Sequence, residues 1–271
     1  KRQGVSWWFR TLKLPADLKG KRFLIHFESV RLRAEVYLDR KLVAYDIIGE
    51  SPFDADITEA VQPGKEQCLA VRVTNPGGNF HWQDFNEMYW GKYQIPPGRS
   101  FGGIIGRVRL DAVSPVYVSD IYMQNQPERT KVKAILTVNN TSAKTEKQDI
   151  YFSVYEKENP GKVILEKKLP RVALKQGTNV VTMELHCPEA RIWDLDTPYL
   201  YVCGVDVKSG KKLSDRAVQT FGFRWFEPVG IGKDAMLRLN GRRVMLRTAI
   251  SWGYWPATGL YATPEMAEKY R

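Results

Sequence analysis

The segment KVKAILTV, residues 131–138, decides the fold class, because its apolar side chains recur at every second position from Val132 to Val138. A period of two places these side chains on one face of a half-buried β-strand. Polar turns such as Asn139-Asn140-Thr141 and Asn159-Pro160-Gly161 separate strand candidates from one another. The other candidates in this region are residues 116–123, 149–155, 163–169, 179–185, 200–207 and 217–223. About seven short strands in about a hundred residues are typical of an immunoglobulin-like sandwich.

Similar strand patterns predict a second group of strands before this one. Its strand candidates are residues 5–14, 22–27, 34–38, 42–47, 53–57, 68–73 and 108–110. The dipeptide Pro63-Gly64 marks a turn between two of them, and Ser114-Pro115 marks a domain boundary. We therefore predict an all-β chain, with one β-sandwich at residues 1–113 and an immunoglobulin-like β-sandwich at residues 114–225.

A long loop interrupts the first predicted sandwich before its last strand. Residues 75–103 read NPGGNFHWQDFNEMYWGKYQIPPGRSFGG, which is rich in glycine, proline and aromatic residues. Loops of this length without secondary structure are uncommon in compact domains and are usually functional. The loop is therefore a candidate for ligand contacts.

The pattern changes again after the second predicted sandwich. Residues 236–239 and 244–246 flank Asn240-Gly241, which is the strongest short signal for a β-hairpin. Further along, Thr263 can cap a helix and Pro264 suits its first position. A strand, an aromatic loop and a capped helix predict that residues 226–271 begin an α/β unit.

Composition excludes several classes of protein. Hydrophobic residues make up 43% of the 271 residues, enough for a sizeable core, and no apolar run reaches the roughly 18 residues of a membrane helix. The net charge of +11 is spread along the strands, without a motif or tract for nucleic acid. Three cysteines and three histidines show no spacing typical of metal ligands, and the cysteines are expected to be buried. We predict no metal, no cofactor and no nucleic-acid partner.

The N-terminal residues do not reveal where the protein resides. Lys1 to Trp8 lack the apolar stretch of a signal peptide, and they begin abruptly with strand-like residues, which suggests that the chain is part of a longer protein. A secreted or periplasmic location is favoured if a leader has been removed, and a cytoplasmic one is open as well. Homo-oligomerisation is also left open.

An ordered set of motifs resembles glycoside hydrolase family 2. FGFRWFE at residues 221–227, followed by LRLNGRRVMLRTAISW at residues 237–252, is similar to that family's passage from its second domain into a barrel. Trp193 followed by PYLY at residues 198–201 resembles a late sandwich strand, and Ser51-Pro52-Phe53 resembles part of a jelly-roll core. The resemblance implies a jelly-roll sandwich, an immunoglobulin-like sandwich and the truncated start of a (β/α)8 TIM barrel at residues 226–271.

The resemblance also implies where the chemistry lies. Members of this family use two glutamates, an acid/base and a nucleophile, to hydrolyse O-glycosyl bonds with retention of configuration. The family pattern places both on later barrel strands, beyond Arg271, and Glu265 and Glu268 at the start of a first helix are no substitutes. No catalytic residue is therefore expected within residues 1–271.

Two groups of residues are candidates for contacts with a β-linked glycoside. In the long loop, Asp84, with Glu87 as the alternative, stands where related galactosidases carry an acidic residue that reaches the sugar pocket. Trp82 and Trp90 flank it. The alternative is a self-packed loop whose acids face solvent, and the Pro96-Pro97-Gly98 insertion blurs the match.

The second group lies at the expected mouth of the barrel, where active sites of barrel enzymes are found. Trp252 and Trp255 suit stacking against the apolar faces of sugars, or else pack the barrel against a sandwich. Arg247 suits a hydroxyl or carboxylate of the substrate, or else pairs with a buried acid.

The sugar specificity is poorly determined by the sequence. Galactosidases and glucuronidases of the family carry an Asn-Arg-His-type run after the first barrel strand, where residues 248–253 read TAISWG. This difference argues against both activities and favours the mannosidase or glucosaminidase branch. The main alternative to a glycosidase is a non-catalytic carbohydrate-binding protein, and a purely structural role for the sandwiches is a third hypothesis.

Overall fold

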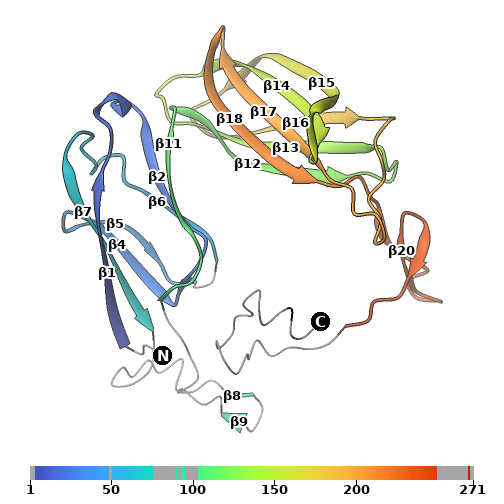
Figure 1. The fold of residues 1–271 in the computed structure, drawn as a ribbon, viewed down its shortest axis with the longest axis horizontal. Coiled ribbons are helices and arrows are strands. Elements are labelled where there is room, and N and C mark those ends of the chain that lie inside the picture. Colours follow the sequence, from blue (N-terminus) through green and yellow to red (C-terminus); the bar gives the residue numbers. More distant parts are fainter. Residues whose placement is uncertain are drawn as a thin grey trace. The chain divides into compact units, whose positions relative to one another are not determined.

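The computed structural model describes residues 4–48, 51–75, 89–90, 93–94, 103–248 and 268. The chain forms two compact units, of which the first runs to Ala112 and the second spans Val113–Thr248. Each contains two main β-sheets that face each other, formed by β1, β2, β4, β5, β6, β7 and β11 in the first and by β12 to β18 in the second (Figure 1). An apolar core lies in each unit. The predicted all-β fold class is confirmed.

The first sandwich consists of a four-stranded sheet, β1-β7-β4-β5, and a three-stranded sheet, β11-β2-β6. Its strands are β1 (Gly4–Lys13), β2 (Arg22–Phe27), β3 (Val30–Arg31), β4 (Arg33–Leu38), β5 (Lys41–Asp46), β6 (Phe53–Asp56), β7 (Glu66–Asn75), β10 (Gly103–Ile104) and β11 (Val108–Val113), with a short 3-10 turn η1 (Ala16–Leu18). The short strands β3 and β10 pair with each other, and so do β8 (Tyr89–Trp90) and β9 (Tyr93–Gln94). Alternate side chains of β2, at Phe23, Ile25 and Phe27, are buried in the core, as its period of two requires.

The second sandwich pairs the sheet β12-β13-β16 with the sheet β15-β14-β17-β18. Its strands are β12 (Val116–Asn125), β13 (Lys131–Asn140), β14 (Glu146–Glu156), β15 (Asn159–Leu174), β16 (Gly177–His186), β17 (Tyr201–Ser209) and β18 (Lys212–Phe221). On β13 the alternation is complete, because Val132, Ala134, Leu136 and Val138 are all buried. The segment that predicted the fold class therefore runs through the centre of one sheet.

Two turns lie elsewhere than the sequence indicates. Asn139 and Asn140 were expected in a turn but belong to β13. Asn159-Pro160-Gly161 was expected to be a turn, but Glu156 pairs with Asn159, so the turn falls at residues 157–158 and β15 begins at Asn159. The sheet accepts Pro160 in a strand because β15 lies at its edge, where one side of the backbone needs no ladder hydrogen bond.

A small antiparallel sheet follows the second sandwich. It consists of β19 (Phe226–Val229), β20 (Met236–Leu239) and β21 (Arg242–Val244). The predicted hairpin at Asn240-Gly241 is confirmed: φ is +51° and +83° at the two residues, the positive values that a type I′ turn requires. The second strand begins at Arg242 instead of Val244, because a two-residue turn pairs Leu239 directly with Arg242. The predicted helix near Thr263 lies outside the described residues.

The cysteines differ from the expectation in one case. Cys187 and Cys203 are buried, and burial raises the pKa of the Cys187 thiol to about 11 and that of Cys203 to about 12. Cys68 is exposed instead of buried. It pairs with Thr11 on the neighbouring strand β1, and its side chain borders a groove on the outer face of the first sandwich.

Candidate functional site

The structure describes few of the residues that were predicted to contact substrate. Trp82, Asp84, Glu87, Trp252 and Trp255 lie outside the described residues. Trp90 belongs to β8, where its backbone pairs with Tyr93. Arg247 follows β21 and is exposed. The predicted contacts of these seven residues with a sugar therefore stay predictions.

One well-defined site is the junction between the second sandwich and the sheet β19-β20-β21. Trp193, on the segment before β17, donates its backbone N–H to the carbonyl oxygen of Phe223 at 2.9 Å. The guanidinium group of Arg224 lies over the Trp193 ring, 4.7 Å from its centre. A Cβ atom at Gly222 would come within 2.9 Å of Cδ1 of Trp193, so glycine lets this indole approach the backbone.

Asn240 ties three chain segments together at this junction. Its Oδ1 accepts a hydrogen bond from the backbone N–H of Trp225 at 2.9 Å, and its Nδ2 donates to the carbonyl oxygen of Trp193 at 2.8 Å. Its own backbone N–H donates to the carbonyl oxygen of Trp225 at 2.7 Å. The hairpin of β20 and β21 is thus fixed to the segment that leaves the second sandwich.

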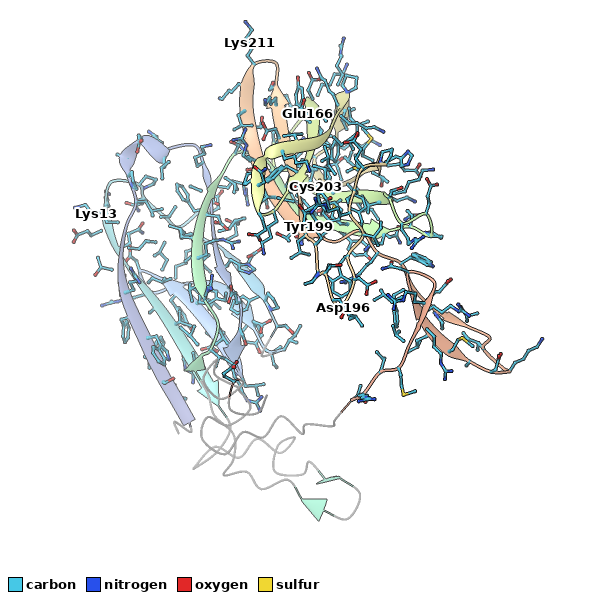
Figure 2. The ribbon with its side chains drawn as sticks, turned by 45° about the vertical axis from the view of Figure 1, so that its right-hand side comes forward. Lys13, Glu166, Asp196, Tyr199, Cys203 and Lys211 are labelled. Atoms are coloured by element: carbon cyan, nitrogen blue, oxygen red, sulfur yellow. The ribbon has the colours of Figure 1, made fainter. Side chains whose placement is uncertain are left out.

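Two tyrosines hold the segment that carries Trp193. The hydroxyl of Tyr201 accepts a hydrogen bond from the backbone N–H of Arg191 at 2.8 Å, and the Arg191 guanidinium lies 5.0 Å from the centre of the Tyr199 ring. Tyr199 also hydrogen-bonds Glu156, whose pKa is lowered chiefly by the hydrogen bond from Lys162. Figure 2 shows Tyr199 beside the second sandwich, close in the chain to Asp196.

A second candidate site is the outer face of the first sandwich. Trp7 and Phe9 of β1 lie nearly parallel, with ring centres 6.0 Å apart and an angle of 11° between the planes. The Tyr37 ring of β4 lies 5.7 Å from that of Trp7. We call these three residues the aromatic face. They line a groove of about 690 Å³ together with Asp39, Arg40, Cys68 and Ala70.

Ala70 explains why the groove is hollow there. The strand register places Ala70 of β7 between Phe9 of β1 and Tyr37 of β4. A methyl group between two rings leaves a depression that a larger side chain would fill. Trp7 and Phe9 remain 47% and 69% exposed at its border, which is unusual for large aromatic residues in a folded domain.

Next to the aromatic face lies a buried carboxylate. Glu35 accepts hydrogen bonds from Arg72 at 2.7 Å and from Arg33 and the Tyr37 hydroxyl. Burial raises the pKa of Glu35, but the hydrogen bond and charge of Arg72, together with Arg33, outweigh this effect and keep the pKa below its ordinary value. Glu35 is therefore an anion that is already neutralised by its neighbours.

A further groove, of about 530 Å³, lies on the second sandwich. The Tyr151 ring, which lines it, is contacted by Lys168 and Lys208, whose amino groups lie 4.9 and 4.7 Å from the ring centre. Lys168 is paired with Asp149 at 2.6 Å, and Lys208 with Asp206 at 3.3 Å. These cations are thus paired within the protein.

We find no cluster of three or more metal-ligating side chains and no helix able to span a membrane in the described part of the chain.

The sequence interpretation missed the aromatic face. Residues 5–14 were assigned to a strand, but the outward pair Trp7 and Phe9, two positions apart, was not singled out. The available signal was two large aromatics on one face of an edge strand. Tyr37 and Ala70 join them only through strand pairing between distant parts of the chain, which no local pattern reveals.

Comparison with known proteins connects the fold to one family. Residues 116–224 match the family profile described as "Glycosyl hydrolases family 2". A β-glucuronidase of Formosa agariphila is 27% identical over 94% of this chain and 26% of its own length. A β-galactosidase of Thermoanaerobacterium thermosulfurigenes is 27% identical over 95% of this chain and 34% of its own length.

A solved structure agrees with the fold. The β-glucuronidase of Bacteroides uniformis superposes with a TM-score of 0.77 and 23% identity, covering 99% of this chain and 32% of that protein. The chain thus spans about a quarter to a third of the length of the relatives it matches. The resemblance predicted from the sequence motifs is confirmed.

Proposed function

Because this chain resembles glycoside hydrolase family 2 over nearly its whole length and shares its β-sandwich fold, we propose that it is the accessory N-terminal region of a β-glycosidase of that family. The observation that supports this proposal best is that 94% of this chain matches only 26% of the length of a β-glucuronidase. The whole enzyme hydrolyses O-glycosyl bonds with retention, using two glutamates that follow Arg271. Residues 1–271 by themselves do not catalyse.

The proposed domains follow the sequence prediction. A jelly-roll sandwich occupies residues 1–113, an immunoglobulin-like sandwich residues 114–225, and the start of the catalytic barrel residues 226–271. The junction at Trp193 and Asn240 supports this arrangement, since it fixes the direction in which the chain leaves the second sandwich. Asp84, in the long loop, is the first candidate for a contact between the accessory region and the bound sugar.

The names of the relatives guide the choice of substrate. Those reported above are β-glucuronidases and a β-galactosidase, whereas residues 248–253 had favoured the mannosidase or glucosaminidase branch. Full-length similarity is a broader observation than one short segment. We therefore propose β-glucuronides and β-galactosides as the substrates to test first.

The proposal is tested on the longer protein that continues past Arg271. Its sequence is expected to add roughly 150 to 200 residues or more, including a pair of catalytic glutamates on later barrel strands. NMR of the released sugar should show the β-anomer first, as a retaining mechanism requires. A stop codon after Arg271 in the natural gene would instead support the carbohydrate-binding alternative.

A further inference from the structure

We propose that the aromatic face of the first sandwich binds an acidic oligosaccharide, whose sugar rings stack on Trp7 and Phe9 while a carboxylate pairs with Arg40. This proposal deepens the proposed function, because it names a class of glycan that the accessory region holds. It rests on described residues of a single compact unit.

The shape of the face suits sugar rings. Trp7 and Phe9 of the edge strand β1 lie 6.0 Å apart with nearly parallel rings, and they are 47% and 69% exposed, so they offer apolar ring surface to a ligand. Pyranose rings carry apolar C–H faces that pack against aromatic rings of this kind, while their hydroxyls remain free for polar partners. A groove of about 690 Å³ lies within the range of about 300–1,000 Å³ that is common for small-ligand sites.

The polar groups of the groove favour a negatively charged ligand. Asp39 accepts hydrogen bonds from the backbone N–H of Cys68 at 2.7 Å and from Gln67 at 2.8 Å, and the Cys68 bond is the main cause of its lowered pKa. Each oxygen of Asp39 thus accepts a hydrogen bond from β7, and Asp39 keeps its negative charge. Glu35, beside the groove, pairs with both Arg72 and Arg33. With Arg40, three positive charges therefore stand against the two negative charges of Asp39 and Glu35.

Arg40 is the cation that remains. Among the described residues no carboxylate forms an ion pair with it, although it lines the groove. The turn between β4 and β5 holds it there, with φ of +46° at Asp39 and +69° at Arg40, and Asp39 fastens this turn to β7. A guanidinium group binds a carboxylate through two parallel hydrogen bonds, so Arg40 can select a uronate over a neutral sugar. The net charge of +11 acts in the same direction.

Calorimetric titration of residues 1–271 tests the proposal. The probes are a β-linked oligoglucuronate and the neutral gluco-oligosaccharide of the same length. We expect the acidic probe to bind more tightly, and its affinity to fall between about 0.05 M and about 0.5 M salt, where charges are increasingly screened. Equal affinity for the two probes, or no binding of the acidic one, would overturn the proposal.

Variants locate the binding. Trp7→Ala and Phe9→Ala should each weaken binding of the acidic probe about fivefold, because each removes one stacking surface. Arg40→Gln should weaken it about threefold, the range of an exposed ion pair, while Arg40→Lys should lose less, because it keeps the charge but not the second hydrogen bond. Tyr122→Ala removes an aromatic that is 56% exposed on the second sandwich, and serves as the matched control.

The remaining outcomes also decide the question. Wild-type affinity in both Trp7→Ala and Phe9→Ala would remove the face from glycan binding. A dimer that either substitution dissociates, seen by size-exclusion chromatography, would overturn the proposal in favour of contact with a second copy. Because the titration involves no hydrolysis, its failure leaves the assignment to a glycosidase untouched. Melting curves confirm that each variant is folded, and the exposure of Phe9 makes its replacement the safer of the two.

Discussion

Replacing Asn240 by glycine should release the small sheet β19-β20-β21 from the second sandwich. Glycine keeps the positive φ of +51° that this turn position requires, so the substitution removes the side chain without straining the backbone. Two hydrogen bonds are lost, one from the N–H of Trp225 at 2.9 Å and one to the carbonyl of Trp193 at 2.8 Å. The hairpin turn itself is retained.

The magnitude follows from these two bonds. Each contributes about 1 kcal/mol net in a partly buried position, so the sheet should lose about 2 kcal/mol of local stability. At about 1.4 kcal/mol per tenfold change, local opening then becomes roughly 30 times more frequent. Asn240→Asp should also open the sheet, because its carboxylate still accepts from Trp225 but sets a negatively charged oxygen against the carbonyl oxygen of Trp193.

Hydrogen exchange followed by mass spectrometry measures this opening segment by segment. Peptides covering residues 226–244 should exchange faster by about that factor in Asn240→Gly, whereas peptides from β13 and β14 should be unchanged and serve as the internal control. Equal exchange of residues 226–244 in the variant and the wild type would refute the role of Asn240 as the link between the second sandwich and the sheet β19-β20-β21.

Other predictions test the two sandwiches and the long loop. Glu35→Gln should destabilise the first sandwich by about 2 kcal/mol at neutral pH, because a neutral amide no longer forms ion pairs with Arg33 and Arg72. Since the pKa of Glu35 is lowered in the folded state, its stabilisation is present above the ordinary pKa of 4.5 and is lost as the pH falls through the lowered folded-state pKa, so the stabilities of wild type and variant from urea titrations should converge at acidic pH. Gly222→Ala should cost about 1–3 kcal/mol by overpacking against Trp193, and an unchanged melting temperature would contradict the close approach. In the longer protein, Asp84→Ala should lower kcat/KM roughly 10- to 150-fold at unchanged melting temperature, the loss of a hydrogen bond to a charged group, and unaltered kinetics in both Asp84→Ala and Glu87→Ala would remove the loop from the active site.

Local patterns predicted most of the strands, because apolar and polar residues alternate wherever one face of a strand is buried in the core. On β2, the bounds 22–27 agree with the structure, since every second side chain enters the core. The prediction failed where strand pairing includes residues that are typical of turns. Pro160 lies in a strand because β15 is at the edge of its sheet. Asn140 was expected in a turn, but it is buried at the end of β13, where its amide donates to the carbonyls of Lys144 and Leu174.

The candidate sites were less accessible to sequence reasoning. Asn240 was recognised as a turn residue, but its hydrogen bond to Trp193 joins residues 47 positions apart in the chain. The groove of the aromatic face likewise depends on strand register, which brings Trp7, Ala70 and Tyr37 side by side from three separate strands. Only contacts made in the folded state define such sites.

The most direct test of the account compares hydrolysis by residues 1–271 with that by the longer protein that continues past Arg271. Both are incubated with the p-nitrophenyl derivatives of β-glucuronide and β-galactoside, and release of the chromophore is followed. We expect turnover by the longer protein alone, because the two catalytic glutamates follow this region. Turnover by residues 1–271 above that of a mock preparation, abolished by a substitution within those residues, would contradict the proposal that this region is accessory.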